Sequence, residues 1–102
     1  MNDAGTTLGI DLGTSELKLA LVDAHGALIA SAGAPLKVSR PHPHWSEQDP
    51  QGWWDALAAA ASALRAKHPE AWSAVKALGL SGQMHGAVLL DGVRRVLRPA
   101  IL

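Results

Sequence analysis

Apolar residues at every second position dominate the first part of this chain. In the stretch LGIDLGTSELKLALVD, residues 8–23, leucine or isoleucine stands at positions 8, 10 and 12 and again at 17, 19 and 21. A period of two is typical of strands that bury one face, and the short GTSE segment between the two runs predicts a tight turn. We therefore expect an antiparallel hairpin with strands near 6–12 and 16–23.

The following residues extend this sheet and add a helix. DAHG predicts a second turn, and ALIASAGA predicts a third antiparallel strand at 27–34. After a polar loop that contains prolines, a helix is expected at 50–67, because Asp49 can cap it and Pro50 suits its first position. The apolar stripe expected on this helix consists of Trp53, Leu57, Ala60, Ala61 and Leu64.

A last strand completes the predicted sheet. VKALGLS, at 75–81, reads as a buried strand, and the helix before it makes the connection a crossover, so this strand should run parallel to an earlier one. Asp91 and Gly92 predict a final hairpin. The expected fold class is α/β: a mixed sheet with a three-stranded antiparallel meander, a crossover helix and a parallel strand.

The composition excludes several classes of protein. A chain of 102 residues with 48% hydrophobic residues suffices for one globular core. Nine basic residues balance nine acidic ones, so no net field favours nucleic acid or an anionic membrane. Cysteine is absent, which excludes disulfides and thiolate metal sites, and no apolar run is long enough to span a bilayer. We expect a cytoplasmic protein with neither a nucleic-acid nor a membrane partner.

Asp11 and Gly13 interrupt the first hairpin, although both residue types are depleted in strands. A turn with glycine leaves backbone N–H groups that a phosphate can approach closely, a role that suits Gly13 and Thr14. Asp11 would then lie beside the phosphate, where its carboxylate can hold Mg²⁺ directly or through water. Asp and Gly are also ordinary hairpin residues, so the tetrapeptide DLGT, residues 11–14, leaves both interpretations open when taken alone.

Four blocks of sequence are together more specific than any single motif. They are GIDLGTSELKLALVDAHG, VSRPHPHWSEQDPQGWW, VKALGLSGQMHGAVLLD and RVLRPAIL, and they span roughly residues 7–102. In their order and spacing they resemble the amino-terminal region of the FGGY carbohydrate kinases, in particular the xylulokinase branch. The resemblance implies the ribonuclease H-like fold of the actin and hexokinase ATPases, and it implies that Asp11 is important for phosphoryl transfer.

The block SGQMHG bears on the sugar. The related glycerol kinases carry an Arg-Glu pair here, whereas xylulokinases carry Met-His, and this chain has Met84 and His85. The resemblance implies that Gln83, Met84 and His85 contact the sugar, since an imidazole can bond a hydroxyl and a thioether can pack against a C–H face. The implied activity is phosphorylation of D-xylulose to D-xylulose 5-phosphate in xylose catabolism, with ATP and Mg²⁺.

Members of this family are several times longer than 102 residues. We therefore expect that residues 1–102 are part of the amino-terminal domain, that the second, ATP-binding domain and the catalytic base lie elsewhere, and that this chain alone is inactive. A homodimeric parent is left open. Two alternatives also stay open: another FGGY pentulose or polyol kinase, and a non-catalytic sugar-sensing module of the same fold.

Other polar clusters carry weaker signals. His42 and His44 share a His-x-His spacing, but zinc would need further ligands. Trp45 is expected to anchor its loop to the fold. Arginine residues stand close together near the end of the sequence, at positions 94, 95 and 98. We interpret this basic cluster of Arg94, Arg95 and Arg98 as a solvated turn.

Overall fold

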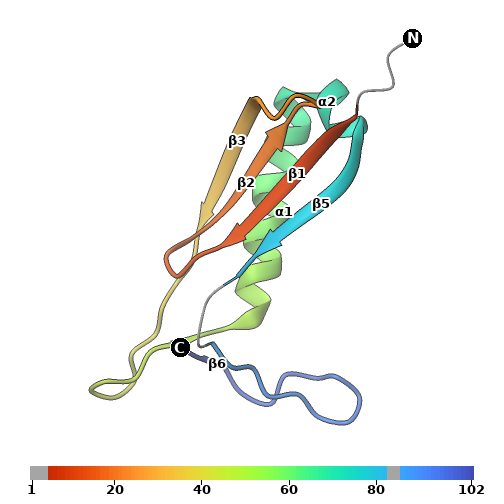
Figure 1. Cartoon of the computed structure of the whole chain (residues 1–102). Helices are drawn as coiled ribbons and strands as arrows, with labels where there is room; N and C mark the ends of the chain where they lie inside the picture. Colours follow the sequence, from red (N-terminus) through yellow and green to blue (C-terminus); the bar gives the residue numbers. More distant parts are fainter. Residues whose placement is uncertain (1–4, 83–85) are drawn as a thin grey trace.

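The chain folds into one four-stranded sheet with a long helix on one face (Figure 1). A computed structural model describes residues 5–82 and 86–102. In chain order the elements are β1 (Thr6–Leu12), β2 (Glu16–Val22), β3 (Leu28–Pro35), β4 (Glu47–Gln48), α1 (Pro50–Lys67), α2 (Pro69–Ser73), β5 (Val75–Ser81) and β6 (Ala100–Ile101).

The sheet has the topology that the sequence predicts. Its strand order is β3-β2-β1-β5, in which β1 and β2 as well as β2 and β3 pair antiparallel, while β5 lies parallel to β1. The three expected strands, the helix and the parallel strand are all present, so the predicted mixed sheet is confirmed. In Figure 1 the arrows of β1 and β5 end at the same edge of the sheet, which is also where the chain turns from β1 into β2.

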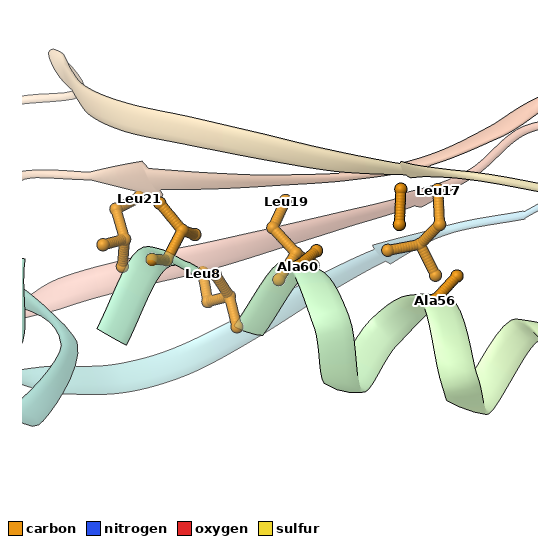
Figure 2. Packing of buried hydrophobic residues seen from close by; sticks show 8 residues of the cluster. Leu8, Leu17, Leu19, Leu21, Ala56 and Ala60 are labelled. Atoms are coloured by element: carbon orange, nitrogen blue, oxygen red, sulfur yellow. The ribbon is translucent and has the colours of Figure 1, made fainter. Parts of the chain in front are cut away.

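The core lies between β2 and α1. Leu17, Leu19 and Leu21 are almost fully buried, and each contributes about 1.5–3 kcal/mol relative to an exposed side chain. Small residues of the helix, Ala56 and Ala60, face these leucines and let the helix approach the sheet closely (Figure 2). The alternating leucines of the sequence are therefore the side of the sheet that α1 covers.

The helix begins and ends where the sequence predicts, but it presents a slightly different face. The Asp49 side chain accepts a hydrogen bond from the Gln51 backbone N–H at 3.0 Å, and Pro50 is the first residue of the helix. In the expected stripe, Trp53 is only partly buried, whereas Ala56, which was not predicted, is buried. The indole Nε1 of Trp53 instead donates a hydrogen bond to Gln48 Oε1 at 3.0 Å.

The prediction that β5 is buried is wrong. Leu78 and Leu80 are 62% and 78% exposed, although they pair in register with Leu8 and Ile10 of β1. The helix packs on β2 and β3, and a helix about 10 Å wide covers roughly two strands spaced about 4.8 Å apart. Because β5 lies at the edge of the sheet farthest from β3, Leu78 and Leu80 extend past the helix.

Residues 86–102 form an irregular segment beyond the end of the sheet. It is attached through β6, which pairs antiparallel with β4, and through Leu102, whose N–H donates to the Ser46 carbonyl at 3.0 Å. The expected hairpin exists as a turn, in which Leu90 and Val96 form an isolated antiparallel bridge. No strands of the predicted length flank this turn within the described residues.

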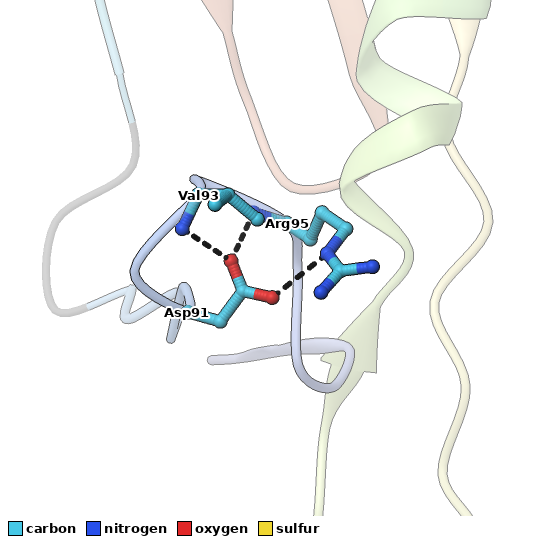
Figure 3. A network of polar contacts seen from close by, with 3 residues as sticks. All are labelled: Asp91, Val93 and Arg95. Carbon is cyan, nitrogen blue, oxygen red and sulfur yellow. Dashed lines mark hydrogen bonds and ion pairs between the residues drawn. The ribbon is translucent and has the colours of Figure 1, made fainter.

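Asp91 organises that turn (Figure 3). Its carboxylate accepts hydrogen bonds of 2.9 Å from the backbone N–H groups of Val93 and Arg95 and from Arg95 Nε. The Arg95 backbone N–H is the largest cause that holds the pKa of Asp91 below its ordinary value, opposed by partial desolvation and supported by the Val93 N–H and the Arg95 guanidinium.

The interpretation of the basic cluster as a solvated turn is wrong for one of its members. Arg98 forms an ion pair with Glu47, a residue of β4 that is only 9% exposed. A nearly buried carboxylate needs a charged partner, so this pair helps to fix the segment 86–102 against β4.

Trp45 packs within its own loop. Its ring lies edge-on to that of His42, with centroids 4.6 Å apart, and its side chain remains 48% exposed. Trp45 also lines a hollow with Ile101 and Leu102, and Ser39 and Glu47 exchange two backbone hydrogen bonds of 2.8 Å that close the loop. None of the described helices has the length and apolar character that a membrane span requires.

Candidate active site

Polar side chains gather where β1 and β5 end. Asp11 and Ser81 are register partners on these parallel strands, and Ser81 Oγ donates a hydrogen bond to Asp11 Oδ1 at 3.3 Å. Both residues are exposed. Asp11 points to the face of the sheet opposite α1, because it alternates with Ile10 and Leu12, which pack against the core. The carboxylate is therefore available to a ligand.

The β1–β2 turn, residues 13–15, lies next to Asp11 in the chain. The Gly13 N–H donates to the Glu16 carbonyl at 3.0 Å, which closes the hairpin and leaves Thr14 and Ser15 as its two loop residues. A Cβ at Gly13 would lie 3.0 Å from the Glu16 carbonyl oxygen, closer than is usual for real side chains. Glycine is therefore favoured here by close packing within the turn.

Lys18 is a site residue that the sequence reasoning missed. It stands opposite Asp11 in the register of the antiparallel strands β1 and β2, and the side chains of such cross-strand partners point to the same face of a sheet. Its exposed ammonium group lies 3.8 Å from Glu16 Oε1. The signal was available in the sequence, because Asp11 and Lys18 stand at equal spacing on either side of the turn.

An open hollow of about 330 Å³ lies on this face of the sheet. Asp11, Lys18 and Ser81 line one part of it, and Gly9, Ala20 and Gly79 line another part where no large side chain covers the backbone. The hollow thus combines an anionic group, a cationic group and accessible main chain at one end of the sheet. This arrangement suits a phosphorylated ligand that carries a cation.

The predicted sugar residues Gln83, Met84 and His85 lie outside the described residues. They follow Gly82, directly after β5 ends at Ser81 beside Asp11. The structure therefore neither tests these three predictions nor joins them to the hollow.

Asp11 has the chemistry that Mg²⁺ prefers. In the described ranges 5–82 and 86–102, no three histidine, aspartate or glutamate side chains come together as a complete metal site. Mg²⁺ is nevertheless often held by one or two carboxylates, by waters and by the phosphates of its substrate. A single exposed carboxylate such as that of Asp11, beside a glycine-containing turn, fits such an ion.

The chain is similar in sequence and in fold to known sugar kinases. The chain is 56% identical over 95 residues to the xylulose kinase of Escherichia coli K12. The matched region covers 93% of this chain and 19% of that enzyme. It superposes on a xyloylose kinase from Brucella ovis with a TM-score of 0.94 at 56% identity, over 95% of this chain and 20% of the other. The chain thus spans only about a fifth of the length of the curated relatives it matches.

More distant structures share the fold. A glycerol kinase from Plasmodium falciparum, solved with ADP, has a TM-score of 0.87 at 20% identity, over 97% of this chain and 20% of the other. The mixed sheet with its crossover helix is accordingly a half-domain of the actin-like and hexokinase-like ATPase fold. The model of the N-terminal domain of the FGGY family of carbohydrate kinases matches residues 6–102, and the chain belongs to this family.

Proposed function

We propose that this chain is the phosphate-binding part of an enzyme that transfers the γ-phosphoryl group of ATP to D-xylulose and forms D-xylulose 5-phosphate. The observation that carries the proposal is the position of Asp11, Lys18 and the β1–β2 turn at one sheet edge, in a chain 56% identical to a xylulose kinase. Residues 1–102 then form part of the amino-terminal domain, and a second, ATP-binding domain comes from other residues.

Each residue of this edge has a proposed role. Gly13 and Thr14 let the phosphates approach the turn backbone, since Gly13 lacks a Cβ and Thr14 is exposed. Lys18 places a positive charge on the same face, where it stabilises charge on the transferred group. Asp11 holds Mg²⁺ through its waters, and when bound the ion neutralises phosphate charge.

The sugar-binding part of the proposal rests on the residues after β5. Gln83, Met84 and His85 would form one wall of the sugar site, because they follow the strand that ends beside Asp11. The group that takes the proton of the sugar hydroxyl lies outside this chain, since the matched relatives are about five times longer. Transfer then requires that a second domain closes on this edge and excludes water.

A chimeric enzyme tests the proposal. Residues 6–102 replace the matched segment of the Escherichia coli xylulose kinase, and ADP release is measured with ATP, Mg²⁺ and D-xylulose, D-ribulose, glycerol or gluconate. We expect D-xylulose to be the preferred substrate, with kcat/KM within about tenfold of the unaltered enzyme. A folded chimera without kinase activity would favour the non-catalytic sugar-sensing module. Preference for another of these substrates would favour a different carbohydrate kinase.

A further inference from the structure

Gln48 joins the β1–β2 turn to the interior of the protein. It belongs to β4, and only 2% of its surface is exposed. Its side-chain Nε2 donates to the Thr14 carbonyl oxygen at 2.5 Å, and its Oε1 accepts from Trp53 Nε1 at 3.0 Å. One buried amide thus connects an exposed turn to the first part of α1.

The second loop residue of the turn is also held through its carbonyl group. The Leu36 backbone N–H donates to the Ser15 carbonyl at 2.9 Å, just after β3 ends. Both carbonyl groups of the loop, those of Thr14 and Ser15, therefore accept hydrogen bonds from elements behind the turn. The orientation of the loop backbone is set by these two donors.

Fixing the Thr14 carbonyl also fixes the next N–H group. In a trans peptide the C=O of one residue and the N–H of the next point in opposite directions, and the described chain contains no cis peptide bond. Since Gln48 holds the Thr14 carbonyl toward the interior, the Ser15 N–H points away from it. This N–H donates to no atom among the described residues, which leaves it available to an incoming acceptor.

We propose that Gln48 is a positioning residue, which orients the Ser15 N–H toward the phosphate of the nucleotide by holding the Thr14 carbonyl from behind. The inference rests on the proposed function, because it assigns a role at the same phosphate-binding edge. Gln48 itself does not contact the substrate; it acts through the turn backbone. A glutamine suits this role because its amide offers a donor and an acceptor in opposite directions, and both are used here.

The test compares two substitutions that both remove the hydrogen bond between Trp53 and Gln48. Gln48→Met keeps the size of the side chain but removes its bonds to both Thr14 and Trp53. Trp53→Phe removes only the bond between Trp53 and Gln48, so the bond to Thr14 remains. A role in packing alone predicts similar effects of the two substitutions, whereas the positioning role predicts that only Gln48→Met alters the turn.

The first measurement uses the 102-residue chain and needs no activity. The amide resonances of Thr14 and Ser15 are recorded by NMR in the two variants, together with the hydrogen-exchange rate of the Gly13 N–H, which donates to the Glu16 carbonyl. We expect Gln48→Met to shift the two resonances, and to speed the exchange of the Gly13 N–H, more than Trp53→Phe does. If Gln48→Met does not fold, Gln48→Asn replaces it, because that side chain is one methylene too short to reach both partners. Unchanged turn resonances would overturn the proposal.

The second measurement uses the chimeric kinase. We expect kcat/KM for ATP to be lower in Gln48→Met than in Trp53→Phe by a factor on the order of 10², because a small misplacement of reacting groups has an effect of this size. The KM for xylulose should differ between the two variants by no more than about twofold. Equal losses in both variants, or equal rises of both KM values, would mean that Gln48 has a purely structural role. An inactive unsubstituted chimera would count against the proposed function, and the NMR comparison would still decide whether Gln48 positions the turn.

Discussion

At the scale of single residues, Asp11 and Lys18 show how a sheet can carry charges close to its core. They pair across β1 and β2 but point away from α1, so neither loses its contact with water. Burying an unpaired charge costs far more than a hydrogen bond returns, which restricts such residues to the open face. The same alternation that builds the core on one face therefore builds the candidate site on the other.

Substitution of Asp11 by Asn in the chimera should keep the fold and reduce turnover. The side chain is exposed, so its loss leaves the core intact, but it removes a negative charge from the proposed metal and phosphate site. We expect kcat to fall on the order of 10²-fold, the scale of losing one group that stabilises transition-state charge. The matched control is Asp55→Asn, at an exposed position of α1. An unchanged kcat for Asp11→Asn would show that Asp11 has no part in the mechanism.

Substitution of His85 by Ala tests the proposed sugar contact. We expect KM for D-xylulose to rise by about tenfold or more while KM for ATP stays close to normal, because one lost hydrogen bond to a substrate hydroxyl costs roughly 1–2 kcal/mol. Steady-state kinetics of the chimera with each substrate varied in turn provide both values. Parallel changes in the two KM values would point to a role in folding instead.

At the scale of elements, one helix is too narrow for the sheet that it covers. α1 packs over β2 and β3, so Leu17, Leu19 and Leu21 of β2 are buried, while Leu78 and Leu80 of β5 remain exposed to water. Similar residue types in two strands of one sheet thus contribute differently to stability. Exposure, and not the hydrophobicity of the strand itself, decides the cost of a substitution.

Two leucine substitutions measure this difference in the 102-residue chain. Leu19→Ala removes a fully buried side chain, and we expect it to lower the free energy of unfolding by about 2–5 kcal/mol. Leu80→Ala removes a side chain that is 78% exposed, and we expect a change within about 0.5 kcal/mol. Urea denaturation followed by circular dichroism gives both values. Comparable losses would show that β5 is covered in solution.

The turn at Asp91 should show an acid-dependent contribution to stability. Because hydrogen bonds from the Arg95 and Val93 N–H groups lower its folded pKa, the stabilisation is present above the ordinary pKa of 3.8 and is lost as the pH falls through the lowered value. Carboxyl ¹³C titration should place Asp91 below 3.8, and Arg95→Ala should raise the pKa only in part, because the backbone donors remain.

Asp23 provides an internal comparison for that titration. In the β2–β3 turn its carboxylate accepts from the backbone N–H groups of Ala27 and His25, which also lower its pKa, but no arginine contacts it. We expect Arg95→Ala to leave the pKa of Asp23 unchanged. A titration of Asp91 at or above its ordinary value would contradict the hydrogen bonding in Figure 3.

At the scale of the whole molecule, the candidate site occupies one edge of one half-domain. The β1–β2 turn, Asp11 and Ser81 lie at the end of the sheet beyond which the segment 86–102 is found, and that segment is attached to β4 (Figure 1). Closure of two domains brings substrates into line and excludes water in enzymes of many kinds. A single wall of such a cleft can bind a phosphate without completing the reaction.

The 102-residue chain by itself should therefore not phosphorylate D-xylulose. We expect its ADP release, in the presence of ATP, Mg²⁺ and xylulose, to fall several powers of ten below that of the chimera, because the positioned base alone contributes roughly 10²–10⁴-fold. The purified chain and the chimera are compared in one coupled assay of ADP release, and circular dichroism checks that both proteins are folded. Turnover by the chain within tenfold of the chimera would show that the catalytic groups lie inside residues 1–102.

The features that could be predicted from the sequence alone are local: the strands, the turns, the capped helix and the glycine turn beside Asp11. These depend on period-two alternation, on Asp49 and Pro50 at the helix start and on short turns, all of which act within a few neighbouring residues. The parallel pairing of β5 also followed, because a crossover helix leaves the chain little choice.

Which surfaces are covered, and which side chains come into contact, became clear only in the folded chain. Trp53 turned from the expected core stripe to donate to Gln48, β5 stayed exposed, and Arg98 found its partner in Glu47. The pair of Arg98 and Glu47 joins residues far apart in the chain, and the exposure of β5 reflects the finite width of one helix, so no local pattern predicts either feature. The bond from Trp53 spans only five residues, but it depends on how the side chains of α1 and β4 face each other. For the same reason the hydrogen bond from Gln48 to Thr14, which spans 34 residues, could be recognised only in the folded chain.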